Sequence, residues 1–394
     1  MNKIPFFALL LLFVSCDRGN KLDGYSHLNQ FREPDDSTIT LYLTKSLKNP
    51  IDNFGIFVDT AYVVALQTTE NKESIVGMIY EAIVTDKYIY IRDNYKTGSV
   101  IIFNSDGTFV KRIATGRGPG EVNEVSKIVF NHYNNTLLVY NLNRINQYSA
   151  DGSFIIAYDS PIISDIVPLN DGYLLVQREW QNIANMNLVI KTDSTFAINE
   201  DNHFFMTDKL VNNFAKFDSR YSGLYCYEQP YLFWPLHNII YAFNDNIIKA
   251  KYQLDYPCVT NAKTYEEYKS KLDNGLYDYS GNYEETSEFV FLQFSSSHEH
   301  KTYDIYISKR NNQSYAIKLP SNRKSVYSYG QFIGKNNDFF VRCIVSLDSE
   351  IKQEIIDNSL LWFSEKSIEK IQQHNSDNDN PLFVFYRLKD IANE

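Results

Sequence analysis

The chain has 394 residues, enough for a large hydrophobic core, and 15% of them are aromatic, including 30 tyrosines and 26 phenylalanines. Aromatic side chains are enriched in strands, so this composition favours β structure. The formal net charge of −10 argues against nucleic acid as a partner, because binding to phosphates requires clustered lysine and arginine.

The first fifteen residues have the pattern of a signal peptide. After one lysine, the apolar run Ile4–Val14 is too short to span a bilayer and has the length of a signal-peptide core. Ser15 and Cys16 then resemble the end of a bacterial lipobox, although Phe13 stands where leucine is usual. The alternative is a plain secretory signal with an incidental cysteine. We expect residues 1–15 to be removed and Cys16 to carry a lipid that anchors the protein stably in a membrane.

The next segment, residues 16–40, is polar, contains glycine and proline, and has no hydrophobic period. This composition is typical of a flexible linker. We therefore expect a tether over residues 16–40 and a single folded domain over residues 41–394.

Three cysteines lie beyond the anchor: Cys226, Cys258 and Cys343. An odd number cannot form a complete set of disulfides. Cys226 and Cys258 could pair in an oxidising compartment, or all three could be isolated buried thiols; the spacing alone leaves both alternatives open.

Three segments align as an internal repeat, namely residues 81–115, 126–160 and 164–199. Each opens with a short apolar strand and continues with three more. The openings are 45 and 38 residues apart and lie at Ala82–Val84, Lys127–Val129 and Asp165–Val167. Four short strands in a period of about 40 residues are typical of a β-propeller blade.

Two Asp-Gly pairs support this alignment. Asp106-Gly107 and Asp151-Gly152 are 45 residues apart and stand at the same place in their repeats. An Asp-Gly pair between apolar runs predicts a hairpin whose two central residues both have positive φ.

Beyond residue 200 the repeat is less regular. The segment Tyr231–Tyr256 has the pattern of a fourth blade, with the turn between its first two strands near His237 and Asn238. Glu288–Leu319 has the pattern of a fifth blade, and a sixth begins at Gly330–Ser346. Long insertions would then occupy residues 201–228 and 261–286, and the two best helical candidates are Lys263–Asn274 and Ser364–Asn375.

Two strands lie outside any complete blade, Thr60–Thr68 near the N-terminus and Asn380–Lys389 at the C-terminus. A ring of blades must join its ends, and a blade built from both termini removes the exposed sheet edges. We therefore expect these two strands to pair in one closing blade.

Several segments together resemble a known family, the six-bladed β-propeller lipoproteins of Gram-negative gut bacteria, whose blades are similar to NHL-repeat propellers. The segments that carry the resemblance are Ala61–Asp93, Gly116–Glu121, Asn274–Phe294 and Asp377–Lys389. The resemblance extends from about Leu41 to the C-terminus. It implies an all-β fold of six four-stranded antiparallel blades, and a lipid-anchored protein of the cell envelope at the outer membrane. It implies no activity, because most members have none assigned.

The topology of a blade predicts which loops share one face of the ring. Loops between the second and third strands, and links between blades, lie opposite the hairpin turns. Charged loop residues on a rigid scaffold are frequent in sites for carboxylates, sugars or peptides. The residues that this predicts for one rim are Arg92, Asp93, Arg117, Glu121, Arg144, Arg178, Glu179 and Trp180. The alternative is that each is a solvated loop charge or part of an ion pair between blades.

The link Ala114–Val122 has three glycines and first suggests a phosphate-binding loop. Glu121 stands where a dinucleotide-binding fingerprint has its third glycine, and Pro119 and the strand that follows leave no helix N-terminus to hold an anion. We interpret the glycines as a tight chain reversal between blades.

No catalytic residue, metal site or cofactor is predicted. His298 and His300 would share one face of a strand, but they stand in a polar hairpin sequence and zinc requires three or four ligands. The chain has no G-x-S-x-G motif. We expect a non-enzymatic binding or scaffolding module for a peptide, a glycan or an envelope protein. The alternative is a lyase or hydrolase that acts on a glycan or peptide in the central channel.

Overall fold

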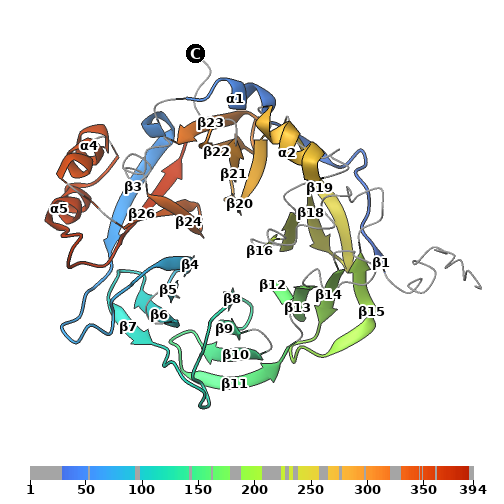
Figure 1. Cartoon of the computed structure of the whole chain (residues 1–394), viewed down its shortest axis with the longest axis horizontal. Helices are drawn as coiled ribbons and strands as arrows, with labels where there is room; N and C mark the ends of the chain where they lie inside the picture. Colours follow the sequence, from blue (N-terminus) through green and yellow to red (C-terminus); the bar gives the residue numbers. More distant parts are fainter. Residues whose placement is uncertain are drawn as a thin grey trace, which may run out of the picture.

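The computed structural model is a ring of β-sheets around a central axis (Figure 1). It describes residues 29–389 apart from 52–53, 94–97, 142–143, 161–162, 178–187, 206–222, 227–229, 234–237, 257–264, 275–276, 297–298, 320–329, 346, 348 and 360–361. Six sheets are present in this part of the chain, each with four antiparallel strands ordered outward from the axis. The predicted six-bladed β-propeller is confirmed.

The first three blades follow the sequence repeat. Blade 1 consists of β4 (Ile79–Val84), β5 (Tyr88–Asp93), β6 (Ser99–Asn104) and β7 (Phe109–Arg112). Blade 2 consists of β8 (Lys127–Asn131), β9 (Thr136–Asn141), β10 (Arg144–Ser149) and β11 (Phe154–Asp159). Blade 3 consists of β12 (Ile163–Leu169), β13 (Gly172–Gln177), β14 (Leu188–Thr192) and β15 (Ile198–Phe205). The strands β5, β6 and β9 are almost wholly buried, because both of their faces pack against neighbouring blades.

The two Asp-Gly pairs form the expected hairpin turns, but with a different backbone. Gly107 and Gly152 have φ of +94° and +82°, whereas neither aspartate has a positive φ. The Asp106 carboxylate instead accepts hydrogen bonds from the Thr108 backbone N–H and hydroxyl, at 2.9 and 2.7 Å. An aspartate that bonds its own turn in this way needs no left-handed conformation.

Blades 4 and 5 begin earlier in the chain than predicted. Blade 4 consists of β16 (Gly223–Cys226), β17 (Pro230–Phe233), β18 (Ile239–Asn244) and β19 (Ile247–Asp255). Blade 5 consists of β20 (Tyr277–Glu285), β21 (Phe289–Ser296), β22 (Lys301–Ser308) and β23 (Ser314–Leu319). Both innermost strands lie in segments that we predicted to be insertions, and the connection near Asn238 joins the second and third strands. Strand β20 carries several polar residues, which weakens its apolar pattern, and β16 is only four residues long.

The closing blade is built from both ends of the propeller, as predicted. Blade 6 consists of β24 (Gln331–Asn336), β25 (Phe339–Ile344), β26 (Leu382–Leu388) and, as its outermost strand, β3 (Val58–Ala65). Strand β3 pairs antiparallel with β26 over its whole length. The two strands are far apart in the sequence, so their pairing holds the ring closed.

A buried polar network fastens the closing blade to blade 5. The Arg342 guanidinium on β25 forms an ion pair with Asp304 of β22, and both side chains are almost fully buried. It also donates hydrogen bonds of 3.2 Å to the hydroxyls of Tyr306 and Tyr386. These tyrosines are hydrogen-bonded to each other at 2.8 Å, so the charge is well surrounded by partners, which a buried ion pair requires.

The N-terminal segment runs along the outer edges of blades 3 to 6. Strand β1 (Asn29–Gln30) pairs parallel with β15, and β2 (Ile39–Tyr42) pairs parallel with β19. Ile51 then bridges to Ile317 of β23 before the chain enters β3. The prediction of a flexible tether is therefore wrong for residues 29–40, because strand pairing and the burial of Phe31 fix this part to the propeller. Residues 1–28, with the predicted signal peptide and Cys16, lie outside the described residues.

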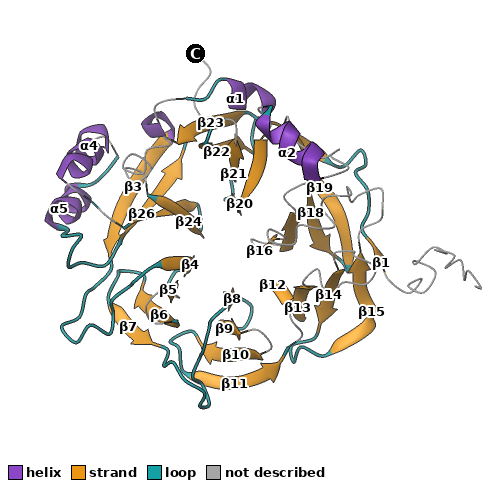
Figure 2. Cartoon of the chain, viewed as in Figure 1, coloured by secondary structure: helices purple, strands orange, loops and turns teal. Residues whose placement is uncertain are grey.

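Short helices lie on the outside of the ring (Figure 2). These are α1 (Thr44–Lys48), α2 (Tyr265–Asp273), α4 (Ser349–Ser359) and α5 (Glu365–Gln373), with a 3-10 turn η2 at Phe54–Phe57. The two predicted helices correspond to α2 and α5. The Ser364 side chain caps α5, and Lys370 donates a hydrogen bond of 2.8 Å to the Val63 carbonyl of β3. Helix α5 thus covers the outer edge of the closing blade. Among the described residues, no helix is both long and apolar enough to cross a lipid bilayer.

Candidate functional site

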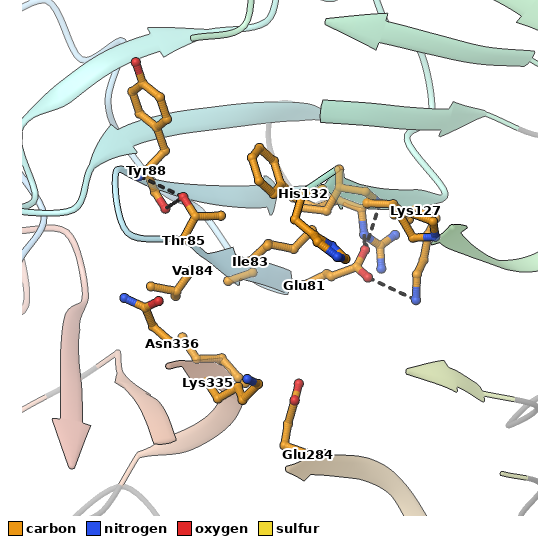
Figure 3. A pocket seen from close by; sticks show the side chains of 18 of the residues that line it. Glu81, Ile83, Val84, Thr85, Tyr88, Lys127, His132, Glu284, Lys335 and Asn336 are labelled. Atoms are coloured by element: carbon orange, nitrogen blue, oxygen red, sulfur yellow. Dashed lines mark hydrogen bonds and ion pairs between the residues drawn. The ribbon is translucent and has the colours of Figure 1, made fainter. Parts of the chain in front are cut away.

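The central channel contains a cavity of about 1110 Å³. It is lined by the innermost strands of five blades, β4, β8, β12, β20 and β24, and by the turns that follow them. The view into this cavity shows charged side chains on opposite walls (Figure 3). Innermost strands hold these side chains in place, because each is hydrogen-bonded into its own blade.

One wall carries a chain of ion pairs that joins three blades. Lys127 Nζ on β8 lies 3.2 Å from Glu81 Oε1 on β4 and 3.1 Å from Asp165 Oδ1 on β12. Arg92 Nε on β5 lies 3.3 Å from Glu81 Oε2. The same Glu81 oxygen accepts a hydrogen bond of 3.0 Å from the Ile128 backbone N–H. The positions of these four side chains therefore depend on one another.

The pKa of Lys127 is governed by the two carboxylates beside it. Burial by itself lowers the pKa of Lys127, but the charges of Asp165 and Glu81 outweigh it, so that the pKa is raised. Lys127 is therefore a permanent cation between two carboxylates. Its role is to bind and position charge, since a lysine in this state cannot serve as a base.

The opposite wall carries Glu284 on β20 and Lys335 on β24, whereas His132, which follows β8, lies across the cavity from Glu284 (Figure 3). Burial raises the pKa of Glu284 to about 7, although Lys335 lowers it; the neighbouring Glu285 raises it further. Burial, with a smaller effect of Lys335, lowers the pKa of His132. Near neutral pH the Glu284 carboxyl group is thus partly protonated, and the His132 imidazole on the other side of the cavity is neutral.

An aromatic side chain borders the cavity near the first wall. Tyr80 is 52% exposed and lines the cavity, and the Arg92 guanidinium lies 5.5 Å from the centre of its ring. Arg92 also donates a hydrogen bond of 3.1 Å to the Val125 carbonyl. Of the predicted rim residues that the structure describes, Arg92 is the one that lines the channel cavity.

The other predicted rim residues are placed differently. Arg117 and Arg144 are exposed. Asp93 is buried, and its carboxylate accepts hydrogen bonds from the backbone N–H groups of Gly77 and Met78 at 2.8 and 3.2 Å. These bonds hold the chain at the start of β4. Arg178, Glu179 and Trp180 lie outside the described residues, and ligand binding on the rim stays a prediction.

The anion that the glycine-rich link holds is the carboxylate of Glu121, a residue of the same link. The Glu121 carboxylate accepts a hydrogen bond of 2.7 Å from the Gly118 backbone N–H. A Cβ atom at Gly116 would lie 2.0 Å from Glu121 Oε2. The glycines therefore make room for this carboxylate, and Glu121 stabilises its own loop.

Sequence reasoning did not select Glu81, Lys127, Asp165, Glu284 or Lys335 as site residues. Lys127 and Asp165 were recognised only as the first residues of blade strands. The signal that could have found them is a charged residue in the innermost strand of a blade, since such a side chain must point to the axis or be buried.

Within the described ranges, no group of three or more His, Cys, Asp or Glu side chains could hold a metal ion. Burial raises the pKa of the Cys343 thiol, which is free. The possible disulfide between Cys226 and Cys258 involves side chains outside the described part of the structure, so it stays a prediction.

The comparison with family models gives one match, which covers residues 38–387 and is described as "Domain of unknown function (DUF4934)". The chain belongs to this family. None of the curated proteins compared with it matches.

Solved structures with the same fold include an exported protein of Bacteroides fragilis, at 19% identity and a TM-score of 0.65, covering 92% of this chain and 100% of that one. A member of the DUF4221 family from Bacteroides vulgatus is 12% identical with a TM-score of 0.48, covering 84% of this chain and 97% of that one. At 19% identity the likeness to the Bacteroides fragilis protein shows the fold of the DUF4934 chain and nothing of its ligand.

Proposed function

We propose that the protein is a non-enzymatic binding module of the cell envelope that takes a polar ligand, part of a peptide, a glycan or an envelope protein, into its central channel. The observation that carries this proposal is the ion-pair chain in which Lys127 joins Glu81 and Asp165 across three blades. Charged groups held in fixed positions around a cavity lose little freedom when a ligand binds, and this favours affinity and orientation.

The proposal includes attachment to the outer membrane through a lipid on Cys16. Its support is the N-terminal sequence, the resemblance to lipoproteins, and the name of the Bacteroides fragilis neighbour, which describes an exported protein. Metabolic labelling with palmitate tests it. We expect label in the wild-type protein and none in Cys16→Ser; equal labelling of both would contradict the anchor.

A direct test of the channel uses peptide and glycan arrays with three proteins: wild type, Lys127→Met and Lys48→Met. Lys48 is exposed on α1 at the outside of the ring and serves as the matched control. We expect at least a tenfold loss of affinity for the best array ligand in Lys127→Met and no change in Lys48→Met. Equal affinity in all three proteins would reject the channel as the binding site.

A lyase or hydrolase acting on a glycan or peptide is the second candidate. The raised pKa of Glu284, about 7, favours it, because a carboxyl group of this kind can act as a general acid or base near neutral pH. Turnover of the array ligands, measured by mass spectrometry with wild type and Glu284→Gln, distinguishes the two functions. A product formed by wild type and lost in the variant would establish the enzyme.

A further inference from the structure

We propose that Glu284 receives a primary ammonium group of the channel ligand. This inference rests on the proposed function, because it assumes that the channel is the binding site. It adds a requirement to that function: the ligand carries a free amine, as a lysine side chain or a non-acetylated amino sugar does.

The other carboxylates that line the cavity already have partners. Glu81 and Asp165 pair with Lys127. The Asp338 carboxylate accepts a hydrogen bond of 3.0 Å from the Ser287 backbone N–H, and Asp86 accepts one of 2.7 Å from the Asn337 side chain.

The Glu284 side chain, by contrast, points into the cavity (Figure 3). The structure records no hydrogen bond or ion pair for its carboxylate among the described residues. It is therefore the cavity carboxylate left to meet a ligand.

The charged groups close to Glu284 are few. Among the described residues, Lys335 on β24 is the cation that acts on Glu284, and the adjacent Glu285 adds negative charge. The Glu285 carboxylate is itself bound on the far side by Lys309 at 2.6 Å. Strand β21 places Phe291 opposite Glu284, and β16 (Gly223–Cys226) has no acidic, basic or histidine residue. Across the cavity lie His132 and the paired groups Glu81, Lys127 and Asp165.

These surroundings make ionisation of Glu284 costly, as its raised pKa of about 7 shows. A cation placed against the carboxylate would remove that cost, whereas a neutral hydroxyl group would not. A metal ion would need more ligands than this wall provides. An ammonium group is a compact charge with three donors and requires a single carboxylate, so it fits this position.

The pH dependence of binding follows from the same geometry. The ammonium group binds the ionised carboxylate, so affinity should rise as pH increases through about 7 and reach a plateau above it. Below that value each pH unit should weaken binding about tenfold. From pH 8 to pH 5 the expected loss is roughly a hundredfold.

The experiment uses two matched pairs of probes and isothermal titration calorimetry. The peptide probes are end-blocked Gly-Lys-Gly and the same peptide with its lysine acetylated. The sugar probes are the β-1,4 tetramer of glucosamine and that of N-acetylglucosamine. The lysine ammonium stays charged from pH 5 to 8, so the peptide profile reports the carboxylate. The two amine probes distinguish a peptide source from a sugar source.

Three proteins are compared with these probes: wild type, Glu284→Gln and Glu288→Gln. Glu288 is exposed on the same blade and does not line the cavity, so it is the matched control. We expect a free-amine probe to bind wild type and Glu288→Gln, and the lysine peptide to do so with the rising pH profile. We expect Glu284→Gln to bind it at least tenfold more weakly at pH 8 and with a flat profile.

The outcomes separate this inference from the function on which it rests. If acetylated and free-amine probes bind wild type equally, or if Glu284→Gln keeps the full affinity, the role of Glu284 is rejected. Loss of that same binding in Lys127→Met would then still support the channel as the site. If no amine probe binds wild type at any pH, the ammonium requirement is rejected, and array ligands that depend on Lys127 decide the proposed function separately.

Discussion

Replacing Glu284 by glutamine should stabilise the folded protein at alkaline pH and leave its stability unchanged at acid pH. The reason is that the folded propeller holds this carboxyl group in a cavity wall that disfavours its ionised form. Glutamine keeps the size of the side chain and removes the charge. Side chains needed for ligand binding often destabilise the folded protein when no ligand is bound, so a substitution that stabilises the protein is expected at a binding site.

The magnitude follows from the pKa. A rise from 4.5 in the unfolded chain to about 7 in the folded protein corresponds to about 3 kcal/mol, at about 1.4 kcal/mol per pH unit. The side chain keeps partial exposure to solvent in the channel, so we expect about 1–2 kcal/mol after screening.

The sign follows from which state binds the proton more tightly. Below pH 4.5 both states are protonated and the wild type bears no cost. Between pH 4.5 and about 7 the unfolded carboxyl ionises first, so the cost to the folded wild type grows with pH and is complete above 7.

Urea unfolding of wild type, Glu284→Gln and the control Glu288→Gln, followed by tryptophan fluorescence at pH 5 and pH 8, measures the effect. We expect the gain in stability of Glu284→Gln over wild type to be larger at pH 8 than at pH 5. A variant that is less stable than wild type at pH 8, or one with the same difference at both pH values, would refute the reasoning.

Three further predictions concern the ring. Asp304→Asn should lower the free energy of unfolding by about 3–5 kcal/mol, because it leaves the buried Arg342 guanidinium without its counter-ion; a loss below 1 kcal/mol in a urea titration would contradict this. Removal of residues 380–394 deletes β26, opens the ring and should lower the melting temperature strongly, and an unchanged melting temperature would show that closure does not depend on this strand. Gly120→Ala should be destabilising by about 1–3 kcal/mol, because φ is +72° and the new Cβ would lie 2.6 Å from Phe154 Cβ; Gly98→Ala, with φ +54° and open space, should cost less, and equal costs would reject the steric argument.

The fold was predictable to the extent that the repeat was regular. In blades 1 to 3 the four strands follow one another with short connections, so their apolar pattern and Asp-Gly turns mark them clearly. In blades 4 and 5 the innermost strands β16 and β20 were missed. Strand β20 is rich in tyrosine and acidic residues, and one side of it faces the central cavity. A polar innermost strand resembles a loop when the sequence is considered alone.

The candidate site was predictable only in part. The assignment of loops to one face of the ring led to Arg92. The carboxylates of Asp93 and Glu121, however, accept hydrogen bonds from backbone N–H groups of nearby loops. Whether a charged loop residue meets a ligand or a backbone N–H depends on distances of a few ångströms, and the order of residues along the chain does not contain them.

The sequence by itself determined the strand period and the closing of the ring by its two ends, and it predicts an N-terminal export signal. These follow from local pattern and composition, which act over a few residues at a time. Only the tertiary structure decided that Lys127 stands between Glu81 and Asp165, and that Glu284 faces the cavity without a bonding partner in the part of the chain that the structure describes. These residues come from different blades, and charges so distant in the chain interact only when the ring brings their strands together around one axis.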